Sequence, residues 1–331
     1  MSKRIMKSFL VVLLLLLGIS FSGQTQNTYK STTAKKGEGI MALLRRNGLD
    51  PAKFMDEFKK INEARLNKNN ELVAGAKYYL PGTDNSETFA IFGKEYESVP
   101  ILDQQLKGAT YYLVSGHGGP DPGAVSIIEN QQVCEDEYNY DITLRLARKL
   151  IQHGALVYMI TRDINDGIRD QRFLYADHDE LCYPDKKMPR NQLLRLRQRT
   201  NAVNKLYLAD RDKFQRVIII HLDSRNKHED LDVYFYYDKR SKSGKKLSNI
   251  LLNKLKEKYN EHQPGRGYDG TVTTRNLYVL QNTYPTATFI ELGNMNHKQN
   301  QKRFLIADNR QALANWLAEG LIQDFNEDDS K

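Results

Sequence analysis

A chain in which strand patterns and helix patterns alternate has few folds open to it, and residues 110–324 show this alternation throughout. Short apolar runs typical of buried strands are separated by segments whose apolar residues recur with the period of a helix. We expect strands at 109–114, 155–161, 217–222, 232–237, 277–281 and 287–293, and helices at 135–154, 191–208, 245–259 and around 313–321. This order predicts an α/β domain with a twisted, mostly parallel sheet flanked by helices on both faces.

The first residues have the pattern of a secretory signal peptide. The basic residues Lys3, Arg4 and Lys7 precede the apolar stretch 9–19. The small residues Ser20 and Ser22 follow it. The stretch is shorter than the roughly 20 residues that a membrane-spanning helix needs, and no cysteine follows it as a lipid acceptor. We therefore expect residues 1–22 to be removed and the mature chain to be exported without a membrane span. The periplasm is the expected location, with the cell wall or exterior of a single-membrane cell as the alternative.

Charge and cysteine content narrow the functional classes. The formal charge is +8, and removal of three signal-peptide cations leaves about +5 on the mature chain, which suits an anionic polymer. Nucleic acid is not expected as a partner, because the chain is exported and has no Lys/Arg stripe interleaved with aromatic residues. Cys134 and Cys182 are too few for a disulfide scaffold and form no CxxC pair. They form either one disulfide or two separate thiols.

Residues 29–82 form a small unit of their own in the sequence. Apolar residues with helical spacing are followed by the strand-like run 76–81, in a segment the size of a binding module. Through the stretch 36–38, Ile61-Asn62 and the stretch 75–81, it resembles LysM modules. The resemblance implies binding to glycans that contain N-acetylglucosamine; the alternative is an ordinary helical spacer.

A polar connection at 83–109 follows this unit, and a polar tail ends the chain at 325–331. Within the connection, residues 89–106 form either a peripheral hairpin or a packed link.

Two histidines stand out because each lies at or just past the end of an apolar strand. His117 lies in the glycine-rich stretch 114–124, and His221 ends the run 217–222. Sites in open α/β sheets gather at the carboxyl ends of the strands. The glycine-rich stretch lacks the motifs of phosphate-binding loops, so we interpret it as the support for a metal ligand. The other histidines lie at a helix end or in polar stretches, where solvated positions are expected.

Two glutamates complete a candidate zinc site. A hydrolytic zinc site uses three protein ligands and leaves one position for water. Glu135 begins the helix after the glycine loop; the helix dipole favours an acid there too, but three consecutive acids exceed what capping needs. Glu291 lies inside an apolar strand, where an unpaired charge would be costly, so it must meet a partner or change its pKa.

These segments resemble the zinc-dependent N-acetylmuramoyl-L-alanine amidases of type 3. The similarity spans about residues 111–322 and rests on "HGGPDPGA", "EDEYN", "IIIHLD" and "FIELGN" in chain order. It implies that His117, Glu135 and His221 bind one zinc ion and that Glu291 is the general base. Arg199 and Asn204 match a family stretch, Arg-x-x-x-Ala-Asn, with Val203 in the alanine position, and are predicted substrate-binding residues.

The resemblance implies a hydrolase that cleaves the amide between N-acetylmuramic acid and the L-alanine of the peptidoglycan stem peptide. The partners would be glycan strands and stem peptides; the sequence names no activator. Two alternatives stay open, an inactive wall-binding protein and a zinc peptidase acting on stem peptides. The inactive alternative is based on departures from the family pattern at Val114, Ile219, Asp223, Asn294, Asn296 and His297. The insertion 163–190 forms either a flap over the groove, tied by a Cys182–Cys134 disulfide, or a loose surface segment.

Overall fold

The structure is a computed structural model that describes residues 29–47, 49–82, 86–211, 213–223 and 232–328. The expected signal peptide lies outside the described residues. Among the helices of the described part of the chain, none has the length and apolar character needed to cross a membrane.

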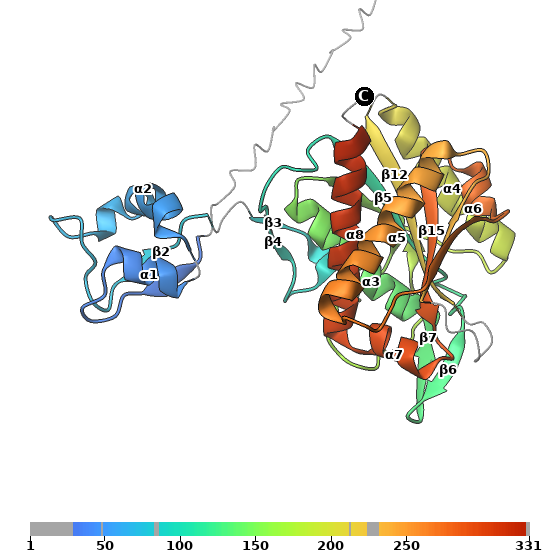
Figure 1. Ribbon diagram of the computed structural model, residues 1–331, viewed down its shortest axis with the longest axis horizontal. Coiled ribbons are helices and arrows are strands. Elements are labelled where there is room, and N and C mark those ends of the chain that lie inside the picture. Colours follow the sequence, from blue (N-terminus) through green and yellow to red (C-terminus); the bar gives the residue numbers. More distant parts are fainter. Residues whose placement is uncertain (1–28, 48, 83–85, 212, 224–231, 329–331) are drawn as a thin grey trace, which may run out of the picture.

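A six-stranded sheet forms the centre of the larger domain (Figure 1). Its strands, in spatial order, are β14 (Gly270–Thr274), β13 (Val233–Tyr237), β15 (Thr286–Asn294), β12 (Phe214–Asp223), β5 (Ala109–Ser115) and β8 (Leu156–Met159). All neighbouring pairs are parallel except β13 with β15. The predicted fold class is therefore confirmed.

Helices cover both faces of this sheet (Figure 1). One face packs against α3 (Glu135–Gln152), α5 (Lys242–His262), α7 (Lys298–Leu305) and α8 (Ala307–Asp328), and the other against α4 (Gln192–Ala209) and α6 (Tyr278–Asn282). Successive side chains of a strand point to opposite faces, so Ile218 and Ile220 of β12 join the first core while Val217 and Ile219 join the second. His221 continues the second series and ends the strand on that face.

One predicted strand is wrong. Residues 277–281 form most of helix α6, and the sheet's edge strand is β14 instead. In α6 the adjacent residues Val279 and Leu280 both pack into the second core, which a helix allows but a strand does not, because successive side chains of a strand point to opposite faces. β14 was missed because an edge strand is half exposed, and the sequence of this one is mostly threonine and glycine. Helix α7 was not predicted either.

The N-terminal unit, residues 29–82, has a β-α-α-β order. Its elements are β1 (Ser31–Thr33), α1 (Ile40–Arg46), α2 (Pro51–Ile61), η1 (Glu63–Arg65) and β2 (Lys77–Tyr79), with β1 and β2 antiparallel. Its core is separate from the two cores of the larger domain and contains Leu43, Leu44, Phe58 and Tyr78. Asn62 is fully buried, and its amide exchanges hydrogen bonds with the backbone N–H and C=O of Tyr79 at 2.7 Å each.

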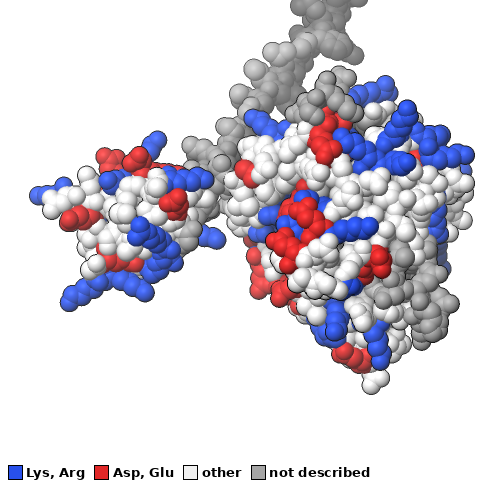
Figure 2. Space-filling view, viewed as in Figure 1, with Lys and Arg blue, Asp and Glu red and all other residues white. Residues whose placement is uncertain are grey.

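Charge is distributed unevenly between the two parts of the chain. Residues 29–82 contain eleven Lys and Arg against six Asp and Glu, whereas residues 83–331 contain thirty-five of each. Figure 2 shows basic side chains spread over the surface of the N-terminal unit, while both signs alternate on the visible face of the larger domain. The basic surplus of the mature chain therefore belongs to the small unit.

Residues 86–100 form a hairpin, which the segment 89–106 covers only in part, and this hairpin is also packed against the domain. β3 (Ser86–Thr88) pairs antiparallel with β4 (Ser98–Pro100), and the turn between them contains η2 (Ala90–Phe92). Phe92 and Val99 are buried in the main core. Both alternatives left open by the sequence thus describe part of what is found.

The insertion 163–190 is an integral part of the domain. Ile168 and Leu174 are buried in the main core, and β10 (Leu181–Cys182) pairs with β9 (Thr161–Arg162) and β11 (Lys186–Lys187). A second hairpin, β6 (Val125–Ile128) with β7 (Gln131–Cys134), precedes α3.

The disulfide considered for this region is not formed. Cys134 and Cys182 are both free and buried. Cys182 packs in the second core beside Ile160 and Met188, whereas Cys134 precedes the first residue of α3. The alternative of two separate thiols therefore holds.

A buried ion network ties α3 to α8. Asp141 is fully buried and accepts hydrogen bonds from Arg145 at 2.8 Å and Arg310 at 2.5 Å. We expect Asp141→Ala to lower the free energy of unfolding by about 3–5 kcal/mol, because it leaves the buried Arg310 guanidinium without its counter-ion and leaves Arg145 with only Asp170, whose side chain is 51% exposed. Urea denaturation measures this change.

The matched control is Glu319→Ala. Glu319 pairs with Lys258 at 3.0 Å, but its side chain is 42% exposed. Its loss should cost less than about 1 kcal/mol. Equal effects of the two substitutions would contradict the importance of the buried network.

Candidate metal centre

The glycine loop after β5 turns the chain sharply so that His117 faces the sheet edge. His117, Gly118 and Gly119 all have positive φ, of 61°, 96° and 63°. The loop is closed by a hydrogen bond from the Gly118 N–H to the Asp121 carbonyl at 2.8 Å. Glycine tolerates this backbone region without steric cost.

Other glycines of the loop provide space for the rings and carboxylate around them. A Cβ on Gly116 would lie 2.3 Å from the His221 ring. One on Gly123 would lie 2.7 Å from both the Glu135 carboxylate and the His117 ring. Both positions require glycine for the close packing of the site.

The three predicted ligands converge. His117 comes from the loop after β5, Glu135 from the first residue of α3 and His221 from the end of β12. Their donor atoms lie within 4.8 Å of one another. The Glu135 carboxylate lies 3.2 Å from Nε2 of His117 and 2.9 Å from Nδ1 of His221. We call these three residues the His–Glu–His cluster.

Backbone and amide donors hold the Glu135 carboxylate in place. Oε2 accepts from the Ala124 N–H at 3.0 Å, and Oε1 accepts from the Leu222 N–H at 3.2 Å and the Asn139 amide at 3.1 Å. Asn139 lies one turn further along α3, on the same face as Glu135. The carboxylate is therefore fixed by the loop, the end of β12 and its own helix.

The electrostatics of the cluster favour bound positive charge. Burial acts to raise the pKa of Glu135, but the hydrogen bonds to His117 and His221 dominate and hold it well below its usual range. Burial acts to lower the pKa of His117, whereas its bonds to Asp121 and Glu135 raise it to about 10. Burial lowers the pKa of His221 and favours the neutral, ligand-competent imidazole.

Glu291 lies beside His221 in the sheet. β12 and β15 are parallel, and the two residues are in register, so their side chains emerge from the same face on strands about 4.8 Å apart. Glu291 is 8% exposed, and Phe289 on the same face stacks on the His221 ring with centroids 4.4 Å apart. All four predicted residues thus lie at one end of the sheet.

The two predicted substrate-binding residues have structural contacts. The Arg199 guanidinium donates to the carbonyl of His117 and is 5% exposed; burial lowers its pKa to about 10, which leaves it charged at neutral pH. Asn204 donates to the Asn282 carbonyl and accepts from the Tyr284 N–H, both at 2.8 Å. Substrate contact by either residue stays a prediction.

Sequence reasoning missed two residues that orient the cluster. Asp121 lies 3.1 Å from Nδ1 of His117, and the Asn139 amide bonds Glu135. A carboxylate on the far nitrogen of an imidazole is a common way to orient a metal ligand. Asp121 could have been found from its place in "HGGPDPGA", and Asn139 from its spacing of four residues after Glu135.

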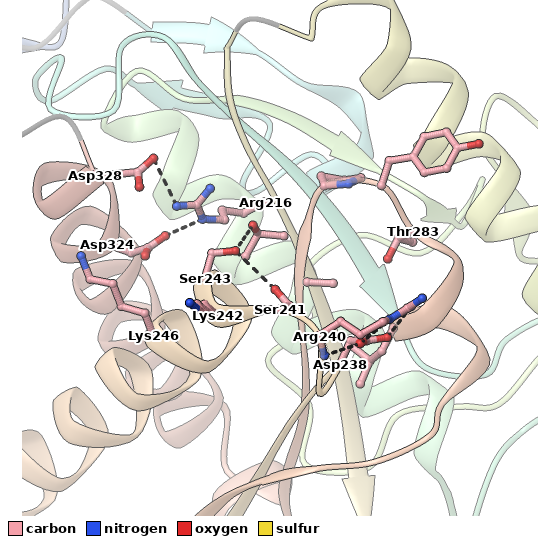
Figure 3. A pocket seen from close by; sticks show the side chains of 15 residues that line it. Arg216, Asp238, Arg240, Ser241, Lys242, Ser243, Lys246, Thr283, Asp324 and Asp328 are labelled. Atoms are coloured by element: carbon pink, nitrogen blue, oxygen red, sulfur yellow. Dashed lines mark hydrogen bonds and ion pairs between the residues drawn. The ribbon is translucent and has the colours of Figure 1, made fainter. Parts of the chain in front are cut away.

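Two cavities lie at different places relative to the cluster. One of about 750 Å³ lies at the amino ends of β12 and β15, lined by residues such as Arg216, Arg240, Ser243 and Asp324 (Figure 3). None of the predicted site residues lines it. Another of about 700 Å³ is bordered by Gly119 and Pro120 of the glycine loop and by residues 178–190 of the insertion. The second therefore borders the glycine loop two residues after His117, although none of the four predicted site residues lines it.

Comparison with known proteins identifies the family of the larger domain. Residues 112–323 match the model of the Amidase_3 family, described as N-acetylmuramoyl-L-alanine amidase. The chain belongs to this amidase family.

Individual relatives of this amidase are distant. The germination-specific N-acetylmuramoyl-L-alanine amidase of Bacillus subtilis (strain 168) is 23% identical over 223 residues, covering 67% of this chain and 82% of that protein. The CwlD amidase of Clostridioides difficile, solved in complex with the GerS lipoprotein, is 19% identical, with a TM-score of 0.48 and coverage of 66% and 98%. Cwp6 from Clostridium difficile is 23% identical with a TM-score of 0.47; 65% of this amidase is covered, but only 29% of Cwp6.

The packing of Gly116 against the His221 ring can be tested by substitution. Gly116→Ala places a methyl group against the His221 ring and must displace it. We expect metal affinity to fall at least about tenfold, a size typical of disturbed ligand orientation. Metal analysis after dialysis measures the affinity, and circular dichroism checks the fold.

Gly39→Ala is the control, because Gly39 has a φ of −91° and nothing lies within 4 Å of a Cβ there. Unchanged metal affinity in Gly116→Ala would contradict the packing described.

Proposed function

We propose that this chain is an exported, zinc-dependent peptidoglycan hydrolase that cleaves the amide bond between N-acetylmuramic acid and the L-alanine of the stem peptide. The observation that carries the proposal is the convergence of His117, Glu135 and His221 within 4.8 Å in a chain of the amidase family. Glu291, in register beside His221, supports a hydrolytic site rather than a purely structural one.

The residues present fit a zinc ion. Two imidazoles and one carboxylate form a ligand set used by hydrolytic zinc sites, which leave one position open. The crowded Gly116 and Gly123 positions leave the space around these donors clear of side chains. Bound zinc supplies a Lewis acid that polarises a carbonyl and acidifies a water molecule.

Glu291 then acts as the general base and, later, as the general acid. Its carboxylate accepts a proton from the attacking water and delivers it to the leaving nitrogen of L-alanine, which becomes a free amine. The amide carbon keeps its oxygen and gains the hydroxyl of the water, so the lactyl group of N-acetylmuramic acid ends as a free carboxylic acid. Asp121 and Asn139 keep His117 and Glu135 oriented while this happens.

The cavity that borders Gly119 and Pro120 of the glycine loop is our proposed substrate groove. Its walls are the glycine loop on one side and the insertion on the other. In this role the insertion limits access from one side, as a wall that packs into the domain core rather than as a tethered flap.

The N-terminal unit is our proposed LysM-like glycan-binding module. Its β-α-α-β order and its surplus of basic residues support binding to a wall polymer. Export through the signal peptide would bring both parts to the cell wall, with the periplasm as the proposed compartment. No nucleic-acid partner belongs to this proposal.

The role of Glu291 is tested by Glu291→Ala. We expect turnover of purified peptidoglycan to fall by about 10²–10⁴-fold, because the proton acceptor is lost, while zinc stays bound. His221→Ala should lose both zinc and turnover. Mass spectrometry of the products and metal analysis of the variants give the two readouts.

The products distinguish the alternatives. Free stem peptides that begin with L-alanine support the amidase, whereas shortened peptides still attached to glycan would identify a peptidase. Binding without products would identify an inactive wall-binding protein. Full activity of Glu291→Ala would overturn the role assigned to that residue.

The binding role of the N-terminal unit is tested through Asn62. Asn62→Ala leaves the Tyr79 backbone groups without partners inside this small core, which should destabilise the unit by about 2 kcal/mol or more. We expect retention on insoluble peptidoglycan to fall severalfold in a co-sedimentation assay, while hydrolysis of soluble fragments is unchanged. The exposed Asn69→Ala is the control; equal retention of both variants would argue against a binding module.

A further inference from the structure

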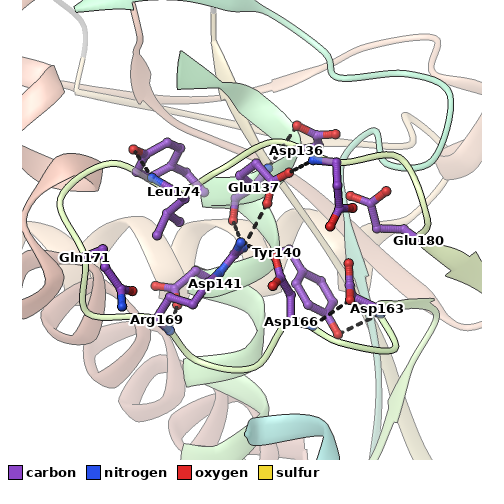
Figure 4. A network of polar contacts seen from close by, with 12 residues as sticks. Asp136, Glu137, Tyr140, Asp141, Asp163, Asp166, Arg169, Gln171, Leu174 and Glu180 are labelled. Carbon is purple, nitrogen blue, oxygen red and sulfur yellow. Dashed lines mark hydrogen bonds and ion pairs between the residues drawn. The ribbon is translucent and has the colours of Figure 1, made fainter. Parts of the chain in front are cut away.

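A second group of carboxylates lies next to the His–Glu–His cluster, where the first turn of α3 meets the insertion (Figure 4). Asp136, Glu137 and Glu180, the acidic cluster, each place a carboxylate oxygen within 4.8 Å of the others. Their exposures are only 1%, 2% and 3%. Asp163 and Asp177 form a second such group with the same Glu180.

Positive charge does not balance this group. The Arg169 guanidinium pairs with Glu137 at 2.9 Å and with Asp166. Within the described ranges, no Lys or Arg forms an ion pair with Asp136 or Glu180. Uncompensated carboxylates are costly to bury, so an ion or a proton must accompany them.

One oxygen atom points to an ion in particular. Oδ1 of Asp136 accepts from the Glu137 N–H at 3.0 Å, but its buried Oδ2 accepts no hydrogen bond from any described residue. Buried polar atoms almost always have a partner, so we expect Oδ2 of Asp136 to bind one. Burial, with the charges of Glu137 and Asp163, also raises the pKa of Glu180 to about 7, although its bond from Gly119 opposes the rise.

We propose that Asp136, Glu137 and Glu180 bind a divalent cation, calcium, at a site distinct from the His–Glu–His cluster. The donors are all carboxylate oxygens, which suit hard cations, whereas zinc prefers sites with nitrogen or sulfur. Calcium takes six to eight oxygen ligands, and Asp163 and Asp177 extend the oxygen set through the shared Glu180.

The site would join three segments that border the candidate centre. Asp136 and Glu137 follow Glu135 directly in α3, and Glu180 belongs to the insertion. Oε2 of Glu180 also accepts from the Gly119 N–H at 2.5 Å, two residues after His117. A bound cation therefore clamps the insertion and the glycine loop onto the start of α3, as a positioning element at the edge of the proposed groove, which Glu180 also lines.

The test uses the full chain, stripped with chelator and reloaded with zinc alone. Calcium chloride is then titrated to about 10 mM by calorimetry, a range that covers weak extracellular sites. We expect saturable binding and a rise in Tm of about 5 to 10 °C at a calcium concentration near 100 times Kd. Terbium luminescence gives a second readout, because the Tyr140 hydroxyl accepts from the Asp163 N–H at 2.9 Å and lies close enough to sensitise the ion.

Variants locate the site. Glu180→Gln keeps the size and the acceptor for Gly119 but removes a charge, and it should abolish the calcium-induced rise in Tm; Asp136→Asn should do the same. Asp185→Asn is the matched control, because Asp185 lies in the same insertion with a 64% exposed side chain paired to Arg162. It should keep the full response.

Failure of this proposal is distinguishable from failure of the zinc assignment, because His221→Ala should lose zinc and keep the calcium response. Absence of both heat and Tm change in the wild-type chain would overturn the proposal. An equal calcium response in Glu180→Gln and wild type would overturn it too, and would leave shared protons as the explanation of the buried carboxylates.

Discussion

The arrangement of the whole site depends on the carboxylate of Glu135. It lies at the point where the glycine loop, the end of β12 and the start of α3 meet, and it accepts a hydrogen bond from each of them. Both imidazoles are aligned on its two oxygens. Displacing this group would release three segments from one another. The carboxylate therefore has a structural role in the fold as well as being a candidate ligand.

Most of the fold could be predicted from the sequence because buried strands and amphipathic helices leave strong periodic signals. The failures occurred where burial is partial or context decides. β14 is an edge strand of threonine and glycine, and its pattern is too weak to separate from a loop. Residues 277–281 are apolar enough for a strand but too short for periodicity to exclude a helix, and packing against the second core decided for α6.

The site shows the same division. Parallel strands bring their carboxyl ends to one edge, so the meeting of His117, His221 and Glu291 could be expected from chain order. Asp121 and Asn139 act through other side chains and leave little signal of their own. The state of Cys134 and Cys182 depends on the path of the insertion, which no local pattern encodes, and the burial of Cys182 beside Met188 keeps it in the second core.

The pairing of β12 with β15 has a consequence for how such a site can arise and fail. Because side chains alternate between faces, sliding β15 by one residue would carry Glu291 into the helix-covered hydrophobic layer and bring Ile290 or Leu292 to the position beside His221. A misaligned sheet would thus bury an acid in the core and remove the proposed proton acceptor from the site. The same strand register is therefore required both for the hydrophobic core and for the proposed site.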